Sequence, residues 1–75
     1  MTLDEFVSAF AAEFDETPED HFKADTEFKA LDEWSSLTAL SIIAMVDEQM
    51  DKTITGADIR ASKTIEDLFN LANSK

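Results

Sequence analysis

The chain has 75 residues, enough for one small domain, residues 1–75. Its 6 basic and 17 acidic residues give a formal net charge of −11, which disfavours contact with nucleic-acid phosphates and anionic membranes. There is no cysteine, and therefore no disulfide or thiolate metal ligand. No apolar run reaches the roughly 18 residues of a membrane-spanning helix, and the N-terminus lacks a signal-peptide pattern. We expect a cytoplasmic protein that binds neither nucleic acid nor membrane.

A first helix is predicted over residues 2–14. Thr2 and Glu5 fit the S/T-x-x-E capping box, and apolar residues then recur at helical spacing. This stripe consists of Leu3, Phe6, Val7, Phe10 and Phe14.

Residues 15–34 are predicted to form a long connection, in which Pro18 favours a short helical turn. Because unstructured loops of this length are uncommon in compact domains, we expect its apolar side chains to pin it across the helices. These side chains are Phe22, Phe28, Leu31 and Trp34. Trp34 is expected to fill the space where the connection meets the next helix.

Residues 36–50 carry the strongest helical pattern, with Ser35 or Ser36 as the N-cap. The predicted buried face consists of Ala39, Ile42, Ile43, Val46 and Met50. A short helix is expected after Thr55, stapled by Ile54 and Ile59, and a last helix after Thr64. The last helix would bury Ile65, Leu68, Phe69 and Ala72. The expected fold is all-α, a small four-helix bundle of three main helices and one short one, with a long first loop.

Three apolar residues of the 36–50 helix, Leu37, Ala44 and Met45, fall outside the predicted buried face. Acidic residues rim them: Asp47, Glu48 and Asp51. On periodicity alone, this surface is either a partner contact or a patch that the long connection covers.

No pattern of a metal site or catalytic centre is present. Calcium loops that begin at Asp47 or Asp51 lack the required glycine or the alternating ligands. His21 is the single histidine, with no cysteine to complete a zinc site or a catalytic dyad. We expect no metal, no catalytic residue and no enzymatic activity.

The run Trp34-Ser35-Ser36-Leu37 resembles the attachment motif of acyl carrier proteins, in which a serine followed by leucine opens the second helix. The resemblance covers essentially the whole chain: an acidic sequence of this length, a long first loop, an acidic second helix and a final helix that opens with Thr64-Ile65. One departure is Ser35, where the family most often has Asp.

The resemblance implies a carrier of acyl-chain biosynthesis, such as fatty-acid synthesis, and a four-helix bundle of acyl-carrier type. It implies 4′-phosphopantetheine, taken from coenzyme A and attached to Ser36. It also implies, as partners of a monomeric carrier, a phosphopantetheinyl transferase and acyl-transfer, condensing or acid-activating enzymes with basic docking surfaces. The residues that would meet these partners are Leu37, Leu40, Ala44, Met45, Asp47, Glu48 and Asp51. The net negative charge is expected to keep the arm off the protein surface.

A growing acyl chain would be shielded between the helices, and the residues expected to line that space are Ile42, Ile43, Val46, Ile59 and Leu68. The same residues also fit a filled core without a cavity.

Two other functions fit the sequence. One is a carrier of an amino acid or another activated acid, although Glu33-Trp34 differs from the Gly-Gly that commonly precedes the serine of peptidyl carriers. The other is an unmodified acidic helical adaptor, in which Ser36 is only a helix cap.

Overall fold

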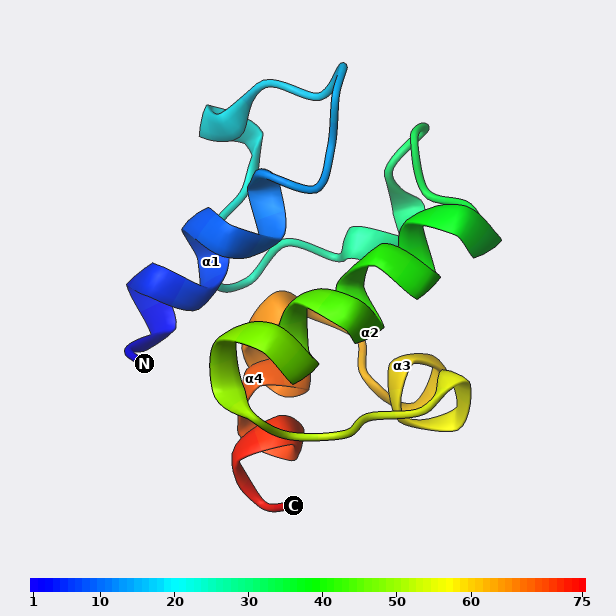
Figure 1. Cartoon of the computed structure of the whole chain (residues 1–75). Helices are drawn as coiled ribbons and strands as arrows, with labels where there is room; N and C mark the ends of the chain where they lie inside the picture. The colour runs from blue at the N-terminus through cyan, green and yellow to red at the C-terminus, as the bar shows by residue number, and fades with distance from the viewer.

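Four α-helices and two short 3-10 turns make up the chain, and there are no strands (Figure 1). The computed structural model describes all residues, 1–75. The elements in chain order are α1 (Leu3–Ala11), η1 (Glu19–His21), η2 (Phe28–Ala30), α2 (Ser36–Met50), α3 (Gly56–Ala61) and α4 (Ile65–Asn73). The expected small all-α domain, with three longer helices, a short one and a long first connection, is confirmed.

The helices begin where their capping residues predict. Thr2, Thr55 and Thr64 each close a reciprocal capping box, with Glu5, Asp58 and Asp67 as the respective partners. Each carboxylate accepts a hydrogen bond from the N–H of its threonine, which lowers its pKa; for Asp58, the ion pair with Lys75 is the larger cause. These boxes satisfy backbone donors that the first turn of a helix otherwise leaves free.

Helix α1 is shorter than predicted. It ends at Ala11, and the N–H groups of Glu13 and Phe14 bond three residues back, to Phe10 and Ala11. This tight turn still buries the Phe14 ring, so the apolar stripe continues past the end of the helix. The extent of the stripe therefore overstated the extent of the helix by three residues.

Helix α1 packs against α2 and α4, and α3 packs against α4. In Figure 1, α2 crosses the middle of the molecule, with α3 to one side of it. Between the helices lies one core of 14 buried residues, including five of the six phenylalanines. None of the four helices has both the length and the apolar character that crossing a membrane requires.

The long connection is pinned to the helices, as its aromatic residues predict. Phe22 and Phe28 are buried, and their rings lie 6.2 and 5.3 Å from that of Phe10 between centroids. The connection also bonds to the start of α4, where the N–H groups of Ile65 and Glu66 donate to backbone carbonyls of residues 26 and 24. The short turn after Pro18 is confirmed as η1, and η2 is a second turn that the sequence did not place.

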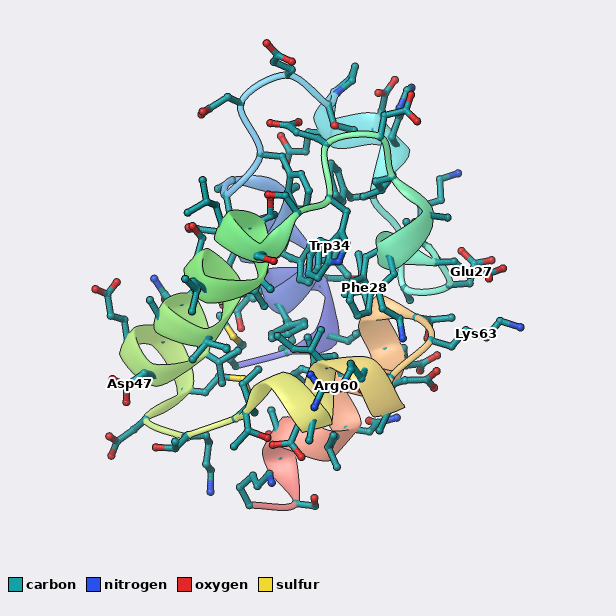
Figure 2. The ribbon with its side chains drawn as sticks, turned by 90° about the vertical axis from the view of Figure 1, so that its right-hand side faces the viewer. Glu27, Phe28, Trp34, Asp47, Arg60 and Lys63 are labelled. Atoms are coloured by element: carbon teal, nitrogen blue, oxygen red, sulfur yellow. The ribbon has the colours of Figure 1, made fainter.

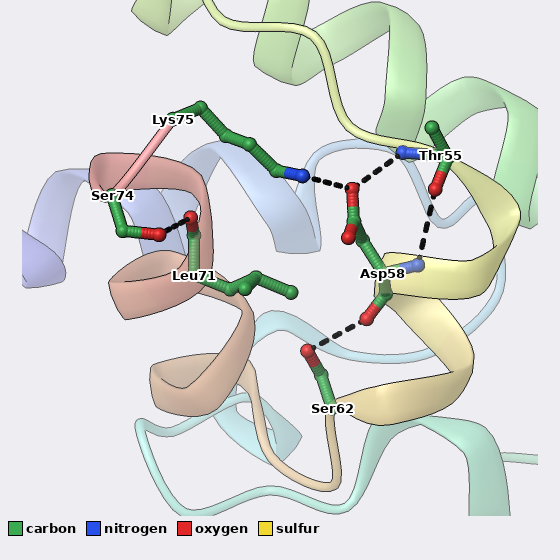
Figure 3. A network of polar contacts seen from close by, with 6 residues as sticks. All are labelled: Thr55, Asp58, Ser62, Leu71, Ser74 and Lys75. Carbon is green, nitrogen blue, oxygen red and sulfur yellow. Dashed lines mark hydrogen bonds and ion pairs between the residues drawn. The ribbon is translucent and has the colours of Figure 1, made fainter.

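An ion pair holds Lys75, the last residue of the sequence, against α3. The Lys75 ammonium lies 2.9 Å from the carboxylate of Asp58 (Figure 3). The same carboxylate accepts the N–H of Thr55, and the Asp58 carbonyl accepts the Ser62 hydroxyl. The end of α4 and the start of α3 are therefore tied together through Asp58.

Candidate functional site

Two adjacent serines at the start of α2 have different environments. Ser35 is the N-cap, with extended backbone (φ −156°, ψ 176°), and its hydroxyl oxygen accepts the N–H of Thr38 at 3.3 Å. Ser36 is the first helical residue, and its side chain is exposed and takes part in no hydrogen bond within the protein. Capping is therefore the role of Ser35, and the Ser36 hydroxyl is free.

The carboxylate of Glu33 holds the segment before these serines in place. It accepts the backbone N–H groups of Asp15, Glu16 and Thr17 at 2.9–3.2 Å, and the Thr17 hydroxyl at 2.7 Å. These hydrogen bonds, the one from the Thr17 hydroxyl above all, lower the pKa of Glu33. Glu33 thus joins the two ends of the long connection, and we call this arrangement the Glu33 clasp.

The two adjacent acidic residues of this junction, Asp32 and Glu33, have different surroundings. Asp32 is exposed, but Glu33 turns inward and organises a loop 16 to 18 residues away in sequence. The sequence contains no periodic signal for this contact, because both partners lie outside regular helices.

Trp34 anchors the same junction from the other side. Its ring centroid lies 5.0 Å from that of Phe28, edge to face, and 6.4 Å from that of Phe14. Figure 2 shows Trp34 and Phe28 side by side. The prediction that Trp34 fills the space between the connection and α2 is confirmed, and the start of α2 is consequently held by both the ring and the Glu33 clasp.

The exposed part of α2 next to Ser36 is apolar. Leu37 is 76% exposed and Leu40 is 62% exposed, the highest values among the large hydrophobic residues of the chain. Ala44 is also exposed and continues the same side of the helix. We call these three residues the leucine face, and the long connection does not cover it.

Met45 does not belong to this face, contrary to the prediction. It is only 3% exposed and is part of the hydrophobic core. At about 100° per residue, Met45 lies roughly 60° from Ile42, and the core covers that side of α2 as well. Because α2 lies across the other elements, its buried arc is wider than the single stripe inferred from periodicity. Ile42 and Val46 are buried as predicted, whereas Ala39, Ile43 and Met50 are half-buried.

The acidic residues Asp47, Glu48 and Asp51 are all exposed at the far end of α2. Asp51 terminates the helix in a left-handed conformation (φ 55°), which Asp tolerates better than most residues. Figure 2 places Asp47 and Trp34 at opposite ends of α2. The free serine and the leucine face thus lie toward the start of the helix, and the acidic group lies at its end.

A cleft of about 370 Å³ opens beside Ser36, between η2, the start of α2 and α3. Its lining consists of Lys29, Trp34, Ser35, Ser36, Ala39, Gly56, Ile59 and Arg60. The two cationic residues, Lys29 and Arg60, were not predicted as site residues. They are 31 positions apart, on short elements whose packing no sequence periodicity specifies.

The larger cleft, of about 480 Å³, lies elsewhere, along the long connection beside the Glu33 clasp and His21. A third, of about 260 Å³, lies between the end of α1 and the connection. Of the five residues expected to line an acyl-chain space, only Ile59 lines any cleft, and Ile42, Val46 and Leu68 are buried in the core. No group of three or more His, Asp or Glu side chains is arranged to hold a metal ion.

Comparison of the chain with protein-family models, curated proteins and solved structures found no match.

Proposed function

We propose that this protein is a carrier that bears 4′-phosphopantetheine on Ser36 and presents acyl intermediates to partner enzymes, in fatty-acid or related acyl-chain synthesis. In this role the fold is a four-helix bundle of acyl-carrier type. When attached, the group supplies a thiol that binds the acyl cargo as a thioester. The chain itself contributes the attachment oxygen and the recognition surface, and catalysis belongs to its partners.

The observation that carries this proposal is the division of roles between Ser35 and Ser36. A serine that opens a helix is usually a cap, and capping would occupy its oxygen. Here Ser35 accepts the first-turn N–H, and the Ser36 oxygen is exposed and uncommitted. The Glu33 clasp and Trp34 hold the junction in place, so a transferase would meet a hydroxyl in a defined position.

The start of α2 suits a phosphodiester. The first turn contains no acidic residue, and the positive end of the helix dipole favours an anion there. In the modification, the Ser36 oxygen attacks the pantetheine-bearing phosphorus of coenzyme A. A P–O bond to serine forms, the P–O bond of the pyrophosphate breaks, and adenosine 3′,5′-bisphosphate leaves. The serine proton passes to a base of the transferase.

The leucine face and the acidic end of α2 are suited to partner enzymes with basic docking surfaces. The exposed leucines next to Ser36 offer apolar contact area, and Asp47, Glu48 and Asp51 offer charges for Lys and Arg. Exposed ion pairs of this kind are weak and are screened by salt. We therefore expect rapid and reversible association, which allows a carrier to move between enzymes.

Intact-mass spectrometry tests the proposal directly. The apo protein is incubated with coenzyme A and a broad-specificity phosphopantetheinyl transferase, and we expect a gain of one phosphopantetheine group. Ser36→Ala should abolish the gain, whereas the matched control Ser35→Ala should retain it. No gain in the wild type, or a gain that persists in Ser36→Ala, would refute attachment at Ser36. Binding to basic partners without any gain would instead favour the acidic adaptor.

A further inference from the structure

Two of the six basic residues of this acidic chain, Lys29 on η2 and Arg60 on α3, line the cleft beside Ser36. No Asp or Glu is among the residues that line it. The cleft is thus a locally cationic region in a protein whose formal net charge is −11. Figure 2 shows Arg60 on α3, below Phe28 and Trp34.

A backbone contact joins the two cationic residues. The Lys29 ammonium donates to the carbonyl oxygen of Arg60 at 2.9 Å, which leaves two of its three donors free. The Arg60 guanidinium is in no ion pair and no hydrogen bond within the protein. It extends back over Gly56, where its Nη1 atom would be 3.4 Å from a Cβ added to the glycine. Its five N–H donors are therefore available to a ligand.

Given the carrier function proposed above, on which this inference depends, we propose that Lys29 and Arg60 bind the phosphodiester attached to Ser36. The guanidinium group of Arg and the ammonium group of Lys form strong, charge-assisted hydrogen bonds to phosphate oxygens. The backbone N–H groups at the start of α2 favour an anion at the same place. The base of the arm then lies in the cleft, against Trp34 and Ile59. This is the opposite of the sequence-based expectation, in which the net negative charge keeps the arm off the surface.

The competing explanation is that the two cations only stabilise the end of α3. Arg60 lies in the last turn of that helix, and Lys29 binds one of its final carbonyls, where positive charge is favourable. If Lys29 and Arg60 only stabilise the end of α3, modification of Ser36 should not change the environment of either side chain. A comparison of the apo and modified forms therefore separates the two explanations.

The experiment uses the modified protein, prepared with a transferase and verified by intact mass, and NMR of both forms. On modification we expect the Arg60 Nε–H signal to shift, and the shift to be lost in 1 M salt, where the screening length falls to about 3 Å. The phosphorus-31 signal of the modified protein should move in Arg60→Gln and in Lys29→Gln, and Arg60→Lys should restore it in part. Lys63→Gln is the matched control, because Lys63 is exposed and does not line the cleft.

The wild-type comparison needs no variant and therefore holds even if Lys29→Gln disturbs α3. A gain in mass with an unchanged Arg60 signal would overturn the binding of the phosphodiester and leave the carrier function intact. A phosphorus-31 signal that responds equally to Lys63→Gln would overturn it as well, because that result indicates only a general effect of charge. Failure to gain mass would refute the carrier function itself.

Discussion

The two adjacent serines at the start of α2 should affect different properties of the protein. We expect substitution of Ser35 to lower stability and substitution of Ser36 to prevent modification. Ser35→Ala removes the oxygen that accepts the Thr38 N–H, and loss of such an N-cap costs about 0.5–2 kcal/mol in the free energy of unfolding. The bond is long, at 3.3 Å, so we expect about 1 kcal/mol, in the lower half of that range. For a domain of this size that lowers the Tm by about 4–8 °C.

Ser36→Ala should behave in the opposite way. Its hydroxyl makes no bond within the protein, and alanine is the best helix former, so the free energy of unfolding should stay within about 0.5 kcal/mol of the wild type. Modification should nevertheless be lost completely. Ser35→Ala should therefore be less stable but still modified, whereas Ser36→Ala should be as stable as the wild type but unmodified.

Urea unfolding, followed by far-UV circular dichroism and by the fluorescence of Trp34, measures the stability of each variant. Trp34 is the single tryptophan and precedes the two serines, so its emission reports on this junction. Intact mass after incubation with transferase measures modification. If Ser36→Ala destabilised the protein more than Ser35→Ala, the division of roles between the serines would be wrong.

Three further predictions concern the core, the Glu33 clasp and the surface charge. Met45→Ala should lower the free energy of unfolding in urea by about 2–5 kcal/mol, because Met45 is buried. Leu40→Ala should change it by about 0.5 kcal/mol or less, because Leu40 is exposed. Equal effects of the two substitutions would contradict the assignment of Met45 to the core and of Leu40 to the surface. The lowered pKa of Glu33 favours its ionised form in the folded state, so its contribution to stability is present above the ordinary value of 4.5 and is lost as the pH falls through the lower folded pKa. Tm measured against pH should therefore fall less steeply below about pH 4.5 in Glu33→Gln, and an unchanged slope would exclude the Glu33 clasp as a source of acid sensitivity. Added salt or divalent cations should raise the Tm of the apo protein by screening its net charge of −11, and a Tm independent of salt would contradict that account.

Local sequence determined where the helices begin. Thr2, Thr55 and Thr64 each supply a hydroxyl and have an acidic residue three positions later, and that chemistry acts within one turn, without help from the rest of the fold. The aromatic residues of the long connection likewise showed that it would pack against the helices. Ser36 could be singled out because Leu37 follows it at the start of a helix, as in the acyl carrier motif that this run resembles.

Tertiary structure decided what depends on residues distant in sequence. Periodicity placed Met45 outside the core, but the elements that cover α2 bury it, and no single-helix pattern contains their positions. The inward turn of Glu33 and the meeting of Lys29 with Arg60 join segments 16 to 31 residues apart through short, irregular elements. The local motif therefore singled out the Ser36 oxygen as the proposed attachment point, whereas only the packing of the connection and α3 placed two cations beside it.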